Sequence, residues 1–260
     1  MAKERSGAGD PARTLALLWR EPATADAPPR RGPKQVLSVD AVVRAAIELA
    51  DSGGLEALTM RAVAQRLGVT PMTLYTYVPG KAELLDLMLD SAYLEMERAE
   101  RPADPWRARV GAVARENLGL CRRHPWVASL PTVRPPLGPG VMAKYEHELA
   151  AFEGLGLTDI EMDAALTFLL QFVHSAVRAE LDAQAAHRDS AMSDAQWWEA
   201  NAPLLARVFN AERYPLAARV GNAAGEAHEA AYSPEHSFRF GLERTLDGLA
   251  ALIESRGGGA

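Results

Sequence analysis

Apolar residues recur at helical spacing along most of the chain, and no segment shows the strict alternation that predicts a β-strand. A connecting helix is expected from Lys81 to about Arg98, amphipathic, with leucines and Met88 turned inward. Breaks rich in Pro and Gly separate the later helices. The pattern predicts an all-α protein whose C-terminal part has helices near 106–122, 139–153, 159–186, 194–210 and 234–254.

Residues 59–81 contain two short helical patterns on either side of a glycine. Thr59 is placed to cap the first helix, and its hydroxyl could equally face a phosphate. Gly68 follows that helix, where a positive φ costs a glycine nothing and permits a sharp reversal. One stripe of the first helix is apolar, formed by Met60, Val63, Ala64 and Leu67.

Thr70 is the expected cap of the second helix of this segment, and Pro71 is the first residue of that helix. It has barely two turns, so it needs anchors on the rest of the domain. Val69, Leu74 and Val78 are the expected anchors, and Thr70, Pro71, Met72, Thr73, Tyr75 and Tyr77 are expected to face outward. Two short helices around a tight turn indicate a helix-turn-helix that reads DNA; the alternative is a plain structural corner.

These residues carry a family resemblance. The segment from Leu37 to about Leu89 resembles the N-terminal domain of the tetracycline-repressor-like (TetR/AcrR) regulators, in its LGV turn, its TLY in the recognition helix and its V-x-x-K-x-x-L-L run. The resemblance implies that Thr70, Pro71, Met72, Thr73 and Tyr75 face the DNA groove. It implies phosphate contacts for Tyr77 and Lys81, with Arg61 as a further candidate. Pro71 and Met72 offer few hydrogen bonds to base edges, so recognition would depend on apolar contacts and DNA shape.

Residues 1–36 are rich in Pro, Ala, Gly and charge, and are expected to be disordered apart from a turn of helix at Leu15–Trp19. That apolar patch would pack on its own domain or on a partner. Arg30, Arg31 and Lys34 form a basic arm that could enter a minor groove, or serve only as a solvated linker.

The C-terminal part also resembles the tetracycline-repressor type, through RHPWVASLP, PPLGPGVM and a long helix after GLGLT. The resemblance implies ligand binding and dimerisation. We therefore expect an arm at 1–36, a helix-turn-helix domain at 37–82 and a ligand-binding and dimerisation domain at 83–260. The helix at 159–186 is apolar nearly all round, which favours a homodimer built as a four-helix bundle with the C-terminal helix; an intramolecular core is the alternative.

The resemblance implies a pocket for a small effector, and the candidate residues suggest an apolar or aromatic ligand with one or two polar anchors. Each candidate for its pocket has ordinary core packing as an alternative role. Residues 211–233 would form a flap over the pocket or simply a loop. The candidate ligand-binding residues are Trp126, Arg134, Met142, Tyr145, Phe168, Phe172 and His174.

The charge is divided unevenly along the 260 residues. Residues 1–81 hold 11 Lys/Arg against 8 Asp/Glu, whereas residues 82–260 hold 17 against 26, within a net charge of −6. Attraction to phosphates is thus expected only at the N-terminal end, which disfavours an architectural DNA-compacting protein. Because the N-terminal excess is modest, specific binding is expected to need two copies of the domain.

Several other functions are disfavoured by missing patterns. No run approaches the ~20 apolar residues of a membrane span, and no signal peptide is recognised. The single Cys121 fits a buried position in a reducing cytoplasm. No P-loop, dinucleotide fingerprint, nucleophile elbow or zinc-protease motif is present, so neither cofactor nor metal is expected. The sequence predicts a non-enzymatic, ligand-released repressor that binds a palindromic DNA operator. The alternative is a helical ligand-binding protein or enzyme in which the helix-turn-helix is only structural.

Overall fold

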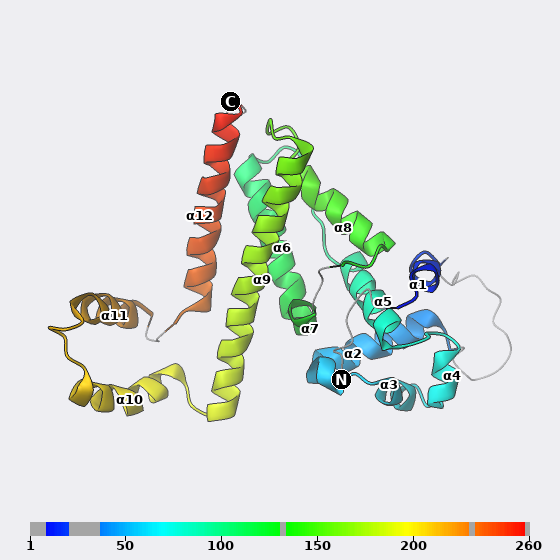
Figure 1. Ribbon diagram of the computed structural model, residues 1–260, viewed down its shortest axis with the longest axis horizontal. Helices are drawn as coiled ribbons and strands as arrows, with labels where there is room; N and C mark the ends of the chain where they lie inside the picture. The colour runs from blue at the N-terminus through cyan, green and yellow to red at the C-terminus, as the bar shows by residue number, and fades with distance from the viewer. Residues whose placement is uncertain (1–8, 21–36, 131–133, 229–231, 258–260) are drawn as a thin grey trace.

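The computed structural model describes residues 9–20, 37–130, 134–228 and 232–257. Those residues form helices α1 to α12 and contain no strand, which confirms the all-α prediction. The helices make two parts, an N-terminal head and a larger core that lies beside it (Figure 1).

The head is formed by α2 (Val39–Ala57), α3 (Met60–Arg66) and α4 (Pro71–Tyr75). The predicted caps are confirmed: the Thr59 and Thr70 hydroxyls accept hydrogen bonds from the amides of Ala62 and Thr73. Gly68 has a φ of 67°, so the reversal between α3 and α4 uses the left-handed region as expected. Local sequence signals therefore determine the geometry of the helix-turn-helix.

Helix α5 (Lys81–Leu94) connects the head to the core and is shorter than expected. The prediction that it is amphipathic was wrong, because α1, α2 and α8 pack against it. Even its acidic residues Glu83, Asp86 and Asp90 are buried, with Asp86 only 1% exposed. A helix buried on nearly all sides moves only together with its neighbours.

The N-terminal segment differs from the expected disordered arm. Residues Pro11–Leu18 form helix α1, which is capped by the Asp10 carboxylate and begins before the predicted turn. Leu18 is 3% exposed and belongs to the same hydrophobic core as α5. Leu17 and Leu18 of the apolar patch thus pack on the chain's own hydrophobic core beside α5, whereas Leu15 and Trp19 are exposed. The basic residues Arg30, Arg31 and Lys34 lie outside the described residues.

The core is built around the long helix α9 (Asp159–Ser190), which packs against α6, α7, α8 and α12. Helix α9 begins with a capping box formed by Thr158 and Glu161. By length and hydropathy it is the one described helix that could span a membrane, a test that core helices also pass. The neighbouring helices are α6 (Trp106–Arg123), α7 (Pro125–Ser129), α8 (Pro139–Ala150) and α12 (Pro234–Ser255).

Helices α10 (Asp194–Val208) and α11 (Pro215–His228) extend away from the rest of the chain (Figure 1). We call these two helices the α10–α11 pair. Residues 211–233 were expected to form a flap or loop, but most of them form α11. Neither helix of the α10–α11 pair buries a residue, so the described part of the single chain provides no core for these helices.

Candidate DNA-binding surface and ligand site

The candidate DNA-binding surface lies on α3, α4 and the start of α5. Leu74 and Val78 are fully buried and anchor α4 to the head. Its exposed side carries Met72 at 76% and Tyr75 at 44% exposure. The tight α3–α4 turn thus presents α4 as a short, rigidly held ridge.

The other predicted DNA contacts lie around this ridge. Arg61, Thr70, Pro71 and Thr73 are exposed, whereas Tyr77 and Lys81 are half-buried. The Thr70 and Thr73 hydroxyls lie 2.9 Å apart, and Tyr77 packs against the core of the head. The structure brings all the predicted contacts it describes to one region, and their roles at DNA stay predictions.

Two of the seven candidate ligand residues contact other side chains of the chain. Trp126 is 2% exposed, and its indole N–H donates to the Asp51 carboxylate at 2.8 Å, so it joins the core to the head. The Phe172 ring stacks on Phe238 with centroids 5.6 Å apart. These two aromatic side chains fill packing positions.

The remaining candidates lie on α8, on α9 and in the segment before α8. The Tyr145 hydroxyl donates to Asp163 at 2.8 Å, and Met142, Arg134 and Phe168 are exposed. His174 is half-buried on α9, where burial and then the nearby Lys144 charge lower its pKa. A role of these residues in ligand binding stays a prediction.

A cavity of about 710 Å³ opens between α6, α8 and the segment 98–102. None of the seven candidates lines it. We call it the α6–α8 cavity. Much of its wall is alanine, a residue that gives no sequence signal for a binding site, which explains why sequence reasoning missed it. Its volume falls in the range of about 300–1,000 Å³ that is usual for small-molecule sites.

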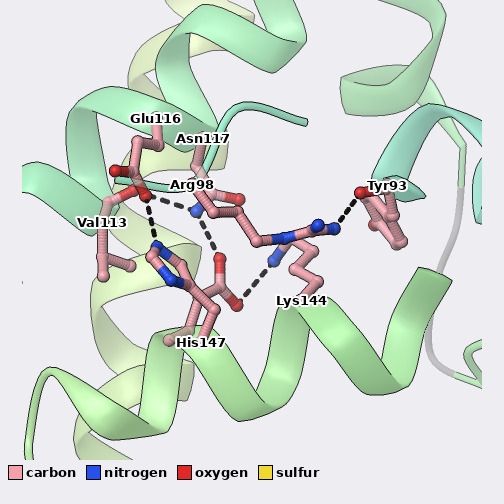
Figure 2. Close-up of polar contacts among 8 residues, drawn as sticks. Tyr93, Arg98, Val113, Glu116, Asn117, Lys144 and His147 are labelled. Carbon is pink, nitrogen blue, oxygen red and sulfur yellow. Dashed lines mark hydrogen bonds and ion pairs between the residues drawn. The ribbon is translucent and has the colours of Figure 1, made fainter. Parts of the chain in front are cut away.

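A buried polar cluster lies beside this cavity (Figure 2). Lys144 donates to Glu148 at 2.7 Å, and Asn117 donates to the other oxygen of the same carboxylate at 2.5 Å. His147 and Glu116, which line the cavity, form a pair at 2.9 Å. The i,i+4 spacing of Lys144 and Glu148 was a readable signal for this ion pair.

Buried ion pairs such as Lys144–Glu148 add little net stability, because desolvation offsets most of their attraction. The cluster is nevertheless well satisfied, since both Glu148 oxygens accept hydrogen bonds. It fixes α6 and α8 against each other at one side of the cavity.

Two joints connect the core to other parts of the chain, the first to the head and the second to the connecting helix α5. At the first, the Asp51 carboxylate of α2 contacts His124 and Trp126, each at 2.8 Å. At the second, Asp90 of α5 accepts a hydrogen bond from the amide of Val141 at 2.9 Å, in the first turn of α8. Burial raises the pKa of Asp90, and hydrogen bonds from the α8 backbone partly oppose this rise.

Helix α1 adds a third joint. The Trp19 indole donates to the carbonyl of Leu137, just before α8, at 2.7 Å. Arg20 pairs with Asp40 at the start of α2. The segment after α1 therefore contacts both the core and the head.

The Asp90 joint depends on the absence of a side chain at Gly140. A Cβ there would lie 2.0 Å from the Asp90 carbonyl oxygen. We expect Gly140→Ala to lower the free energy of unfolding by about 1–3 kcal/mol, as overpacking does, measured by denaturant unfolding.

Gly119 of α6 is the matched control, because a Cβ at this position meets nothing within 4 Å. Gly119→Ala should leave stability unchanged or raise it by up to about 1 kcal/mol. Equal stability of the two variants would show that α8 does not approach α5 this closely.

Cys121 is buried in α6 at 1% exposure, as the sequence predicted. Burial raises its pKa to about 11. We expect alkylation by iodoacetamide at pH 8 to be about a hundredfold slower in the native than in the unfolded protein, because the thiolate is the reacting form. Similar rates measured by mass spectrometry would mean that this part of α6 opens readily.

Two family models match the chain. The model described as "Bacterial regulatory proteins, tetR family" covers residues 42–88, and that described as "Tetracyclin repressor-like, C-terminal domain" covers residues 99–253. Together they span the head and nearly all of the core.

Similar proteins include transcriptional regulators matched over most of their length. The transcriptional repressor DrrR1 of Streptomyces coeruleorubidus is 44% identical over 98% of this chain and 91% of its own. The class E tetracycline repressor protein of Escherichia coli is 27% identical over 85% of this chain and 94% of its own.

Solved structures of Streptomyces coelicolor ActR have the same fold. The complex with actinorhodin superposes with a TM-score of 0.67 at 26% identity, covering 83% of this chain and 96% of ActR. The complex with (S)-DNPA gives a TM-score of 0.66 at 27% identity, covering 83% and 98%.

Proposed function

Since the chain belongs to the tetracycline-repressor (TetR) family of bacterial regulatory proteins, we propose that it is a cytoplasmic, ligand-responsive transcriptional repressor. It binds a palindromic DNA operator as a homodimer and is released by a small, largely apolar effector. The observation that carries this proposal is the exposed ridge of α4, held by buried Leu74 and Val78.

The head contacts DNA through two sets of side chains. Thr70, Pro71, Met72, Thr73 and Tyr75 face the major groove, where their methyl groups and hydroxyls meet base edges and thymine methyls. Arg61, Tyr77 and Lys81 contact phosphates, which fix the orientation of the head without reading the sequence. Arg30, Arg31 and Lys34 would follow the minor groove beside it.

Dimerisation is supported by apolar surface on α9 and α12. Ile160, Phe168 and Phe240 are each more than half exposed, and Phe168 lines a shallow groove with Leu249 and Leu252. Single exposed apolar residues are ordinary, but several of them along two adjacent helices favour an interface. A two-fold axis would bring both helices of each copy into a four-helix bundle.

The α10–α11 pair supports dimerisation independently. Exposed large apolar residues occur along both of its helices, although isolated helices of this length are marginal in water. A second copy would supply the surface that the single chain does not. The exposed side chains are Trp197, Trp198, Leu204, Leu205, Val208, Tyr214, Leu216 and Val220.

The response to an effector follows from linkage. A ligand weakens DNA binding only by the difference in its affinity for the two conformations of the protein. Helix α8 forms a wall of the α6–α8 cavity and contacts α5 at Asp90. Helix α5 begins at Lys81, so a displacement of α8 shifts the head and the spacing between two heads.

The proposal is tested with a labelled duplex of random sequence, before any operator is known. Fluorescence anisotropy should detect weak binding, with a dissociation constant of about 10⁻⁴–10⁻⁶ M near physiological salt, that weakens steeply as salt is added. Arg61→Ala should reduce the salt dependence, whereas Arg115→Ala on α6 should not. Absence of binding at low salt would support a helix-turn-helix that is only structural.

A further inference from the structure

Two arginines of the α6–α8 cavity have unusual surroundings. The Nε atoms of Arg98 and Arg109 are buried and lack a hydrogen-bond partner in the part of the chain that the structure describes. Both residues line the cavity. A buried N–H without a partner is unfavourable, so each of these guanidinium groups keeps one unused donor.

Backbone carbonyls, not carboxylates, hold these two guanidinium groups. Arg98 donates to the carbonyl of Tyr93 (Figure 2), and Arg109 donates to the carbonyl of Glu153 at 3.2 Å. Among the described residues, neither arginine forms an ion pair, in contrast to Arg101, which pairs with Asp104. The positive charges of Arg98 and Arg109 are therefore oriented but not neutralised.

The interior acidic groups nearby are already satisfied. Glu116 is paired with His147, and Glu148 accepts hydrogen bonds from Lys144 and Asn117 (Figure 2). The other glutamates of the cavity, Glu100, Glu146 and Glu153, are exposed to solvent at its rim. A buried anion would thus find unused donors in the wall, whereas a buried cation would find its potential partners occupied.

The rest of the wall is small and apolar. Ala112 and Val113 of α6 and Ala143 and Ala150 of α8 line the cavity. Short side chains at these positions leave room between the helices, and they offer only van der Waals and hydrophobic contact. The wall suits an apolar body of small-molecule size.

We propose that the α6–α8 cavity is the effector site and that it takes an apolar molecule bearing a carboxylate, which accepts hydrogen bonds from Arg98 and Arg109. The role as an effector site rests on the proposed function, whereas the binding of a carboxylate in the cavity does not. Arginine suits the role because its guanidinium stays charged and its forked donors match a carboxylate.

The test compares two probes of the same shape, anthracene-9-carboxylate and anthracene-9-carboxamide, binding to the full-length protein without DNA. Calorimetry or probe fluorescence should show the acid binding about ten- to hundredfold more tightly, as expected for charge-assisted hydrogen bonds. Equal affinities, or no binding of either probe, would overturn the proposal.

Variants locate the preference within the cavity. Arg98→Gln and Arg109→Gln should each reduce the preference for the acid, and the double variant should abolish it. Arg98→Lys and Arg109→Lys should retain much of it, because they keep the charge. Arg115→Gln, an exposed residue of the same helix α6 that does not line the cavity, is the matched control and should behave as wild type. A preference that survives in a folded double Gln variant would contradict the assignment.

Addition of the acid probe to a protein–DNA complex separates the two proposals. Binding of the acid with no change in DNA affinity would leave the site assigned and remove its role as an effector site. Specific DNA binding by a protein that does not discriminate the probes would overturn the site while the proposed function stands.

Discussion

Replacing Tyr75 and Lys81 together by alanine should weaken operator binding by about a hundredfold or more, while the protein stays folded and dimeric. Each lost contact is worth about 1–3 kcal/mol, and a dimer loses every contact twice. Tyr75 is 44% exposed on α4 and lies outside the buried core, so its truncation removes little packing.

Single variants divide this loss into its parts. Lys81→Ala should weaken binding to all sequences and lower the salt slope by about two in a dimer, one for each phosphate contact. Tyr77→Phe should also weaken binding to all sequences. A change of base preference in Lys81→Ala would contradict its assignment to a phosphate. Arg115→Ala removes the same charge from the exposed face of α6 and should leave the salt slope unchanged.

Phe168→Asp should convert the dimer into monomers and abolish operator binding as a consequence. Phe168 is 55% exposed in the single chain and lines the groove between α9 and α12. Burying a phenylalanine contributes about 1.5–3 kcal/mol, and the two-fold axis applies this loss twice. An aspartate in the same place also introduces an unpaired charge, which is costly to bury.

Sedimentation velocity of wild type and variant over a range of concentrations measures this effect. Leu94→Asp is the control, since Leu94 is likewise 50% exposed but lies at the end of α5, away from α9 and α12 (Figure 1). A Phe168→Asp protein that remains dimeric, or a wild-type protein that is monomeric, would contradict the proposed interface.

The head could be predicted from sequence because its signals are local. Thr59, Gly68 and Thr70 act on the backbone within a few residues of themselves, and the structure has each in its expected role. The amphipathic prediction for α5 was wrong because the burial of Asp90 depends on α8, some fifty residues away.

The α6–α8 cavity could not be predicted from the sequence for a different physical reason. Aromatic residues were natural candidates, yet Trp126 bonds to Asp51 and Phe172 stacks on Phe238. The cavity is lined by small residues such as Ala112 and Ala143. A space left by short side chains has no sequence pattern of its own until the helices are placed.

Selection of bound duplexes from a random DNA pool, at near-physiological salt, tests most directly whether two copies of this head read DNA. The wild type should enrich an inverted repeat whose half-sites lie about 34–36 Å or somewhat more apart, and the Tyr75→Ala/Lys81→Ala protein should enrich nothing. Absence of an enriched repeat from a folded, dimeric wild type would contradict sequence-specific repression.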